Sequence, residues 1–253
     1  MTGVQTCALP ISLFSRHGLN LASKDARRDM GLLKRDHIHA ILALPNIRAE
    51  WLAREGHEPQ ESDTSALFGE FGPLQMEIIT EHSQLIPGVV ETVRAWQERG
   101  IRIGSTTGYT RSMLAPVLEQ AARGGYRPDA CVCPDEVGAG RPAPWMLMRN
   151  AQILDVYPPL SCVKIGDTIA DVQEGKNAGM WTIGLTRTGN LIEMAEAEWQ
   201  KLPESEKSKR VQDAEAILLA AGADYVAEDL PGCNAALEQI EQRLADGADG
   251  VRS

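Results

Sequence analysis

The spacing of hydrophobic and polar residues changes once along the chain, near Pro87 and Gly88. Between residues 13 and 85, apolar side chains recur three or four positions apart, as in residues 36–44 and 65–71. This spacing places apolar side chains on one face of a helix, and no stretch here alternates convincingly as a strand would. The first part of the chain is therefore predicted to be a small helical bundle.

After Gly88 the chain repeats a unit of one helix and one short strand that is apolar or β-branched. The predicted helices cover residues 89–99, 111–123, about 144–154, a segment ending at Gly179, a polar insertion at 191–210 and a last helix ending at Leu244. The predicted strands cover residues 101–106, 129–133, 162–166, 181–185 and 224–227. Helices that alternate with strands are typical of parallel sheets, so this half is predicted to be a Rossmann-like α/β domain.

The pattern divides the chain into three segments. Residues 13–85 are the helical domain, and residues 86–253 are the α/β core domain, which makes the fold class α/β. Residues 1–12 fit neither domain. They are not a signal peptide either, because their short apolar patch lacks the basic segment that such a peptide has. They resemble the translation of a common sequencing adapter, and we expect them to be foreign to the natural chain.

Composition narrows the classes of function. The 253 residues carry 25 basic and 35 acidic side chains, a net charge of −10, which disfavours nucleic acid and anionic membranes as partners. No apolar run approaches the roughly 20 residues of a membrane span. The five cysteines lack the paired spacing of a disulfide framework or a zinc site. A soluble protein of the reducing cytoplasm is the expectation.

Ligands of open α/β sheets bind at the carboxyl ends of the strands, so the loops there carry the candidate chemistry. The first such loop contains Thr106, Thr107, Gly108 and Tyr109. Its hydroxyls and backbone N–H groups suit a phosphate at a helix N-terminus. A plain helix cap by Thr107 or Thr110 is an equally good interpretation.

Two further loops carry charge. Arg141 stands in a segment rich in glycine and proline, a rigid mount for a guanidinium that binds oxyanions. Asp167 and Asp171 lie four positions apart, where a predicted strand ends and a helix begins. Their oxygens suit Mg²⁺, which takes one or two carboxylates together with phosphate oxygens. An exposed arginine and a capped helix are the structural alternatives.

The helical domain contributes one more candidate, Lys34, which follows Met30 and two leucines. Burial favours the neutral amine of a lysine, which condenses with a carbonyl to form a Schiff base. On these residues alone, a lysine that faces water is the more common outcome. His37 lies three positions further on the same helical face, either for proton transfer or as a surface histidine.

Together, these loops resemble those of the haloacid dehalogenase superfamily of phosphotransferases. Its second, third and fourth loops resemble Thr106-Thr107-Gly108, Arg141, and Asp167 with Asp171. Segments 30–37, 104–111, 139–146 and 166–182 also resemble a family within it that cleaves carbon–phosphorus bonds, over a match from about residue 13 to the C-terminus. The helical domain is then the cap of that fold, and its lysine sets this family apart.

The resemblance implies magnesium-dependent hydrolysis of a small phosphonate, in which a Schiff base on Lys34 accepts the electrons of the broken bond. The implied catalytic residues are Lys34, His37 and Arg141. The implied substrate and phosphate contacts are Met30, Thr106, Thr107, Gly108 and Tyr109, and the implied Mg²⁺ ligands are Asp167 and Asp171. The resemblance also implies a homodimer formed through the cap.

One family motif is not found in the sequence. The family begins with an apolar strand that ends in an Asp-x-Ala-Gly-Thr-like motif, whose aspartate is the nucleophile and a metal ligand. We therefore expect the chain as given to lack its first core strand and to be nearly inactive. Two other functions stay open: a different phosphatase or phosphomutase of the superfamily, and a non-catalytic phosphate-binding relative.

Overall fold

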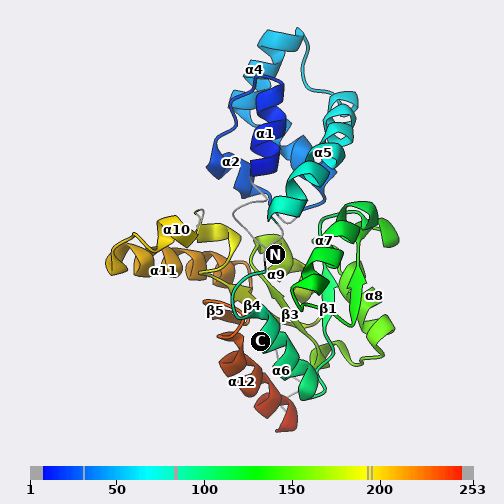
Figure 1. Cartoon of the computed structure of the whole chain (residues 1–253), viewed down its shortest axis with the longest axis vertical. Coiled ribbons are helices and arrows are strands. Elements are labelled where there is room, and N and C mark those ends of the chain that lie inside the picture. The colour runs from blue at the N-terminus through cyan, green and yellow to red at the C-terminus, as the bar shows by residue number, and fades with distance from the viewer. Residues whose placement is uncertain (1–7, 31, 83–84, 193, 195, 247–253) are drawn as a thin grey trace.

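The computed structural model describes residues 8–30, 32–82, 85–192, 194 and 196–246. Figure 1 shows two parts, a helical cap and an α/β domain. The cap contains α1 (Ala8–Arg16), α2 (Ser23–Arg28), α3 (Lys34–Leu42), α4 (Pro45–Glu55) and α5 (Glu61–His82). These helices confirm the helical bundle that the periodicity of the first part of the sequence predicts.

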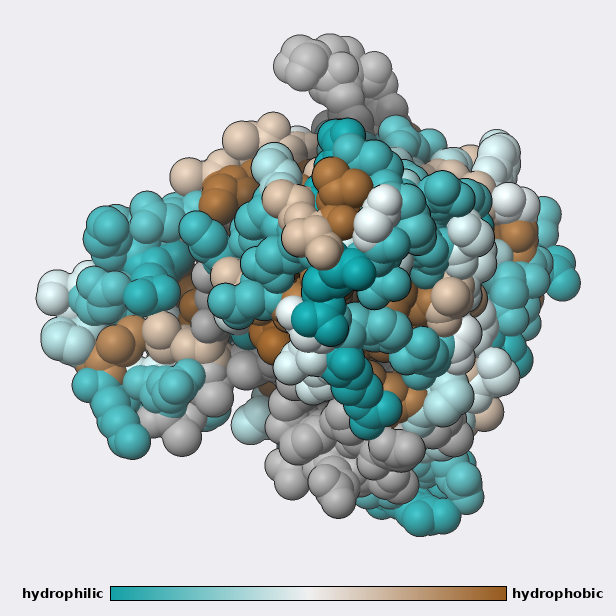
Figure 2. All heavy atoms as spheres, turned by 90° about the horizontal axis from the view of Figure 1, so that it is seen from above, coloured by the Kyte–Doolittle hydropathy of each residue, from teal (hydrophilic) through white to brown (hydrophobic). Residues whose placement is uncertain are grey.

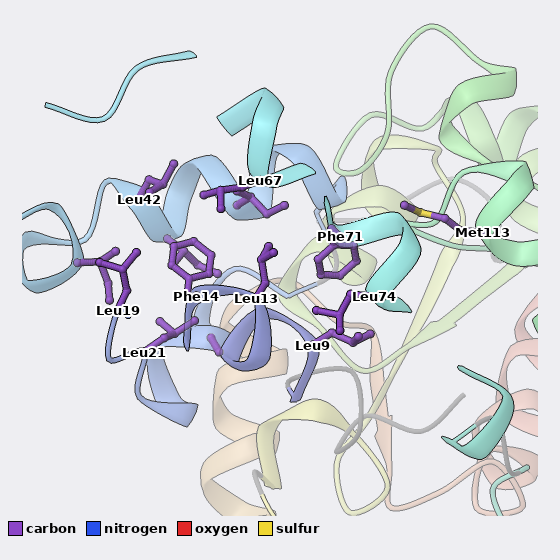
Figure 3. Packing of buried hydrophobic residues seen from close by; sticks show 14 of the residues in the cluster. Leu9, Leu13, Phe14, Leu19, Leu21, Leu42, Leu67, Phe71, Leu74 and Met113 are labelled. Carbon is purple, nitrogen blue, oxygen red and sulfur yellow. The ribbon is translucent and has the colours of Figure 1, made fainter. Parts of the chain in front are cut away.

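Apolar side chains at helical spacing form the interior of the cap. Leu67, Phe71 and Leu74 lie four and three positions apart on α5, and all three are buried. Figure 3 shows them beside Leu13 and Phe14 of α1, which are completely buried. Burying an aromatic or aliphatic side chain of this size stabilises a fold by about 1.5–3 kcal/mol, so this cluster is what holds the cap together.

The ends of α4 follow from its sequence. Pro45 is the first residue of the helix, where a backbone N–H would have no partner within the helix, so the absence of this group costs nothing. Gly56 follows the last residue in the left-handed conformation, with φ of 76°, which glycine adopts without a steric penalty.

The α/β domain alternates helices and strands. Its strands are β1 (Gly104–Thr106), β2 (Ala130–Val132), β3 (Val163–Gly166), β4 (Trp181–Leu185) and β5 (Tyr225–Ala227). Its α-helices are α6 (Val89–Glu98), α7 (Arg111–Arg123), α8 (Trp145–Leu154), α9 (Ile169–Asn177), α10 (Glu196–Trp199), α11 (Glu204–Ala220) and α12 (Cys233–Ala245). Short 3₁₀ turns are η2 (Pro134–Glu136), η3 (Pro159–Ser161) and η4 (Asn190–Ile192).

All strand pairs are parallel, which confirms the predicted α/β class. β1 pairs with β2, and Ser105 lies opposite Cys131. β3, β4 and β5 form a second sheet, in which Ile165 lies opposite Ile183. In the described part of the chain no backbone ladder joins β1 to β3. Side chains link these two strands instead, because Lys164 Nζ donates to Thr106 Oγ1 at 2.9 Å.

Most element boundaries differ from the prediction by no more than two residues, and two elements differ by more. The strand predicted at residues 101–106 is limited to Gly104–Thr106. The polar insertion predicted at 191–210 consists of η4, α10 and α11, and α11 continues to Ala220. Pro203 lies between α10 and α11, and the two helices are separate because proline has no backbone N–H to continue the preceding helix. Buried Leu218 anchors α11, the longer of the two.

The segment predicted to be foreign, residues 1–12, is described from residue 8 onward. Residues 8–12 belong to α1, and Leu9 is buried in the apolar cluster of the cap. Residues 1–7 lie outside the described residues. The boundary at residue 12 and the one between residues 85 and 86 stay predictions.

The face of the molecule seen from above is mainly polar. Figure 2, a view from above, shows hydrophilic side chains over most of this face, with apolar ones between them. None of the described helices combines the length and the apolar character that crossing a membrane requires.

Candidate active site

The loops after β1 and β3 are fixed by their own side chains. Thr107 is buried, and its Oγ1 accepts a hydrogen bond from the backbone N–H of Tyr109 at 3.1 Å, which closes a turn around Gly108. Thr168 caps α9, because its Oγ1 accepts from the N–H of Asp171 at 3.1 Å. The predicted phosphate loop is thus a rigid turn, and Thr110, the alternative cap, makes no capping bond with its side chain.

Two cations and two carboxylates are buried together beneath these loops. Lys164 Nζ lies 2.9 Å from Asp171 Oδ1 and 2.9 Å from Glu174 Oε2. Arg141 Nε donates to the same oxygen of Glu174 at 3.0 Å, and Arg141 Nη1 lies 3.0 Å from the same oxygen of Asp171. The four side chains are 0–9% exposed and their formal charges cancel. We call these four residues, with Thr106, the charge cluster.

Thr106 connects the charge cluster to β1. Its Oγ1 accepts hydrogen bonds from Arg141 Nη2 at 2.7 Å and from Lys164 Nζ at 2.9 Å. The cluster therefore ties β1, β3, α9 and the Arg141 loop to one another. Ion pairs are tolerated in an interior only when each charge is paired, and each of these four charges has an opposite charge within 3.0 Å.

Local sequence explains how the cluster assembles. Asp171 and Glu174 are three positions apart on α9, which places both on the face that packs on β3. Gly175 allows the close approach, because a Cβ there would lie 2.4 Å from Thr182 Cγ2 and 2.8 Å from Lys164 Cβ. An alanine at this position would push the helix away from the strand.

The two predicted metal ligands have different surroundings. Burial raises the pKa of Asp171, but the charges of Arg141 and Lys164 outweigh burial and hold that pKa below its usual range. Burial also raises the pKa of Asp167, and the negative charge of Asp171 raises it further. The N–H of Asn190, which donates to Asp167 Oδ2 at 2.8 Å, offsets only part of this. Asp167 is the carboxylate with the most to gain from a bound cation.

A magnesium site would rest on few protein ligands. Within the ranges that the structure describes, no three His, Cys, Asp or Glu side chains come together as a metal-ligand set. Asp171 is occupied by two cations and by the Thr168 hydroxyl, which donates to it at 2.6 Å. Because Mg²⁺ keeps several waters and takes only one or two carboxylates, Asp167 fits as its direct ligand.

The cap presents a buried lysine to the α/β domain. Lys34 is the first residue of α3 and is 7% exposed. Its Nζ donates to Met30 Sδ at 3.5 Å and lies 5.8 Å from the centre of the Tyr109 ring. Met30 and Lys34 of one predicted segment are therefore brought to Tyr109 of another, across the boundary between the two domains. The interpretation of Lys34 as a solvent-facing lysine is wrong.

His37 is buried inside the cap and is 1% exposed, so its interpretation as a surface histidine is also wrong. Its Nε2 lies 2.9 Å from the carbonyl oxygen of Ala26, which assigns the ring proton to Nε2 and leaves Nδ1 unprotonated. Burial first, and the charge of Lys34 second, lower the pKa of His37 to about 3. At neutral pH the imidazole is neutral and accepts a proton only at a cost.

This pKa predicts an acid-sensitive cap. The unfolded chain protonates His37 near pH 6.5, whereas the folded chain does so only near pH 3, so acid favours unfolding between these values. Between pH 7 and pH 5, protonation of His37 in the unfolded chain should lower the free energy of unfolding by about 2 kcal/mol. Urea unfolding at both pH values should show that His37→Gln loses less free energy of unfolding between pH 7 and pH 5 than the parent chain does. The exposed His57→Gln control should lose as much as the parent, and equal losses in all three chains would contradict the prediction.

The structure also contains functional candidates that sequence reasoning missed. Lys164 and Glu174 complete the charge cluster, and Asn190 holds Asp167. The signal for Lys164 was a charge within an apolar strand, and for Glu174 its three-residue spacing from Asp171. Nothing in the sequence pointed to Asn190, because its partners lie far away along the chain.

Comparisons with known proteins agree with this geometry. The haloacid dehalogenase-like hydrolase family matches residues 2–179, and a related hydrolase-like family matches residues 138–232. A phosphonoacetaldehyde hydrolase of Nitratidesulfovibrio vulgaris (strain Miyazaki F) is 42% identical over 95% of this chain and 86% of its own. One from Syntrophobacter fumaroxidans is 39% identical over 94% of this chain and 86% of its own.

Solved structures give the same picture. The crystal structure of a phosphonoacetaldehyde hydrolase-like protein from Oleispira antarctica has a TM-score of 0.95 and 34% identity, and the match covers 97% of this chain and 90% of that one. A hydrolase from Pseudomonas syringae has a TM-score of 0.68 at 18% identity, covering 94% and 92% of the two chains, a likeness of fold alone.

Proposed function

Because the chain belongs to the haloacid dehalogenase-like hydrolases, and within them to the phosphonoacetaldehyde hydrolase family, we propose that it hydrolyses phosphonoacetaldehyde to acetaldehyde and phosphate once the Asp-x-Ala-Gly-Thr-like strand of that family precedes the cap. The observation that carries the proposal is Lys34, a buried amine in the cap that faces Tyr109 of the α/β domain. Breaking a carbon–phosphorus bond directly would leave a carbanion, which is a poor leaving group. An iminium on Lys34 removes this obstacle because it accepts the electron pair.

The proposed steps balance as follows. Lys34 Nζ attacks the aldehyde carbon and a water molecule leaves, which forms a protonated imine. The electron pair of the carbon–phosphorus bond moves into this imine as the bond breaks, giving an enamine. A second water molecule supplies its oxygen to the phosphoryl group, which ends as phosphate. The enamine is protonated on carbon and hydrolysed, which releases acetaldehyde and restores the amine. His37, one helical turn from Lys34, is proposed to assist these proton transfers.

The α/β domain is proposed to stabilise the phosphoryl oxygens. Arg141 contributes the positive charge, and the turn of Thr106, Thr107, Gly108 and Tyr109 contributes backbone N–H and hydroxyl donors. Such donors lower a barrier when they are already fixed where charge develops, and both groups are held by the contacts described above. Closing the cap over them would exclude water.

The family implies a divalent metal ion, and we propose that it is Mg²⁺. Asp167 is its proposed direct ligand, because this partly buried carboxylate accepts the Asn190 N–H and is not an ion-pair partner of the cluster cations. When bound, the ion neutralises charge on the phosphoryl oxygens. Asp171, the second predicted ligand, is proposed to act mainly by orienting Arg141 and Lys164.

Chemical trapping tests the proposal. Sodium borohydride reduces an imine to a stable amine, so incubation with phosphonoacetaldehyde and borohydride should attach the substrate carbon skeleton to the peptide that contains Lys34. Lys34→Ala should abolish the label. The exposed Lys24→Ala control should keep it. A label on Lys164, the second buried lysine of this site, or one that survives Lys34→Ala, would overturn the assignment.

A panel of phosphate esters separates the other enzyme function. Ester hydrolysis that is unaffected by Lys34→Ala would favour a general phosphatase in which Lys34 only binds anions. The family likeness also supports a homodimer and a cytoplasmic location, and we propose both. Sedimentation of the purified chain would test the homodimer.

A further inference from the structure

A contact between two distant segments joins the cap to the α/β domain. Arg27 lies in the last turn of α2, and Asn190 is the first residue of η4, after β4. Arg27 Nη1 donates to the carbonyl oxygen of Asn190 at 3.4 Å. In return, Asn190 Nδ2 donates to the carbonyl oxygen of Arg27 at 3.3 Å. In Figure 1, α2 lies at the end of the cap nearest the α/β domain.

The core half of this contact also holds Asp167. The backbone N–H of Asn190 donates to Asp167 Oδ2 at 2.8 Å. The preceding Gly189 fits tightly, since a Cβ there would lie 2.4 Å from the Leu185 carbonyl oxygen and 2.9 Å from Asp167 Cβ. Asn190 thus binds the cap with its side chain and carbonyl, and the site carboxylate with its N–H.

The energetics suit a contact that opens and closes. Arg27 is 5% exposed, yet it forms no ion pair with a carboxylate in the described residues. Its Nε donates only to Ser23 Oγ, at 3.4 Å. A buried guanidinium held by long hydrogen bonds to neutral oxygens gains little over its hydration in water. Breaking this contact therefore costs little, whereas the paired charge cluster stays intact.

We propose that Arg27 and Asn190 form a latch that closes the cap and, through the Asn190 N–H, fixes Asp167 in the same movement. Arg27 is in this view a positioning residue, because it acts on the site through Asn190. The contact itself does not depend on the substrate. Only its effect on turnover rests on the proposed function.

Hydrogen exchange tests the coupling without relying on activity. Arg27→Met should speed backbone exchange about tenfold or more in residues 186–192, although the altered residue lies in the cap. Asn190→Ala keeps its N–H but loses the side-chain donor, so it should speed exchange in residues 22–30. Arg28→Met is the matched control, since exposed Arg28 pairs with its neighbour Asp29 at the surface, and it should change neither segment. Unchanged exchange in residues 186–192 of Arg27→Met would overturn the latch.

Kinetics add a second readout. In a chain that carries the family's N-terminal Asp-x-Ala-Gly-Thr-like strand, each single variant should lower kcat/KM about tenfold, and the double variant Arg27→Met with Asn190→Ala should be no slower than either, because both break one contact. Losses that multiply in the double variant would contradict the latch. If no chain turns over phosphonoacetaldehyde while the exchange differences persist, the proposed function fails and the latch stands. Should Arg27→Met fail to fold, Asn190→Ala alone decides through exchange in residues 22–30.

Discussion

In a chain that carries the family's N-terminal Asp-x-Ala-Gly-Thr-like strand, Lys34→Met is expected to lower kcat/KM for phosphonoacetaldehyde by about 10⁴-fold, a loss comparable to the removal of covalent catalysts from other enzymes. The methionine keeps most of the buried volume beside Met30 but cannot form an imine. Without the imine, the electrons of the carbon–phosphorus bond have no acceptor, and the barrier rises by about 5 kcal/mol. Steady-state release of phosphate measures the effect.

Lys34→Arg separates covalent catalysis from simple binding of an anion. Arginine restores the positive charge and its stacking on the Tyr109 ring, but its guanidinium stays protonated and forms no imine. We therefore expect Lys34→Arg to be as slow as Lys34→Met. Recovery of most of the activity in Lys34→Arg would show that Lys34 acts only through its charge, which would remove the basis of the proposed mechanism.

The site could be predicted from sequence where one local rule applied. Polar residues after the strands were expected to converge at one edge of the sheet, and Thr106, Arg141 and Asp171 do so. The division into a helical part and an α/β part followed from the change of periodicity at Gly88. These features depend on neighbours in the chain or on one general property of parallel sheets.

What was missed depends on contacts between distant segments. His37 is buried because α2 and its Ala26 carbonyl pack against α3, which helical spacing alone does not reveal. Asn190 meets Arg27 across 163 positions of sequence. Lys164 is tolerated inside a strand because Asp171 and Glu174 reach it from α9. Each role is set by a partner that no local pattern specifies.

The charge cluster carries the second large expectation, which concerns stability. Lys164→Met removes one of its two cations and leaves Asp171 and Glu174 to share Arg141. A buried charge that loses its partner costs about 3–5 kcal/mol. Because 1 kcal/mol shifts the Tm of a protein of this size by about 2–4 °C, we expect a Tm lower by roughly 10 °C. Thermal unfolding followed by circular dichroism measures it.

Balance of charge, and not the lysine as such, is what the cluster requires. The double variant Lys164→Met with Glu174→Gln restores a net charge of zero, and it should therefore be more stable than Lys164→Met alone. Lys176→Met is the matched control on α9, because Lys176 pairs with Asp224 at a partly exposed site and should cost less than about 1 kcal/mol. If the double variant is less stable than Lys164→Met, the balance of charge is not what the cluster requires. Neutralising the excess carboxylate would then bring no gain, and Glu174 would stabilise the fold by something other than its charge.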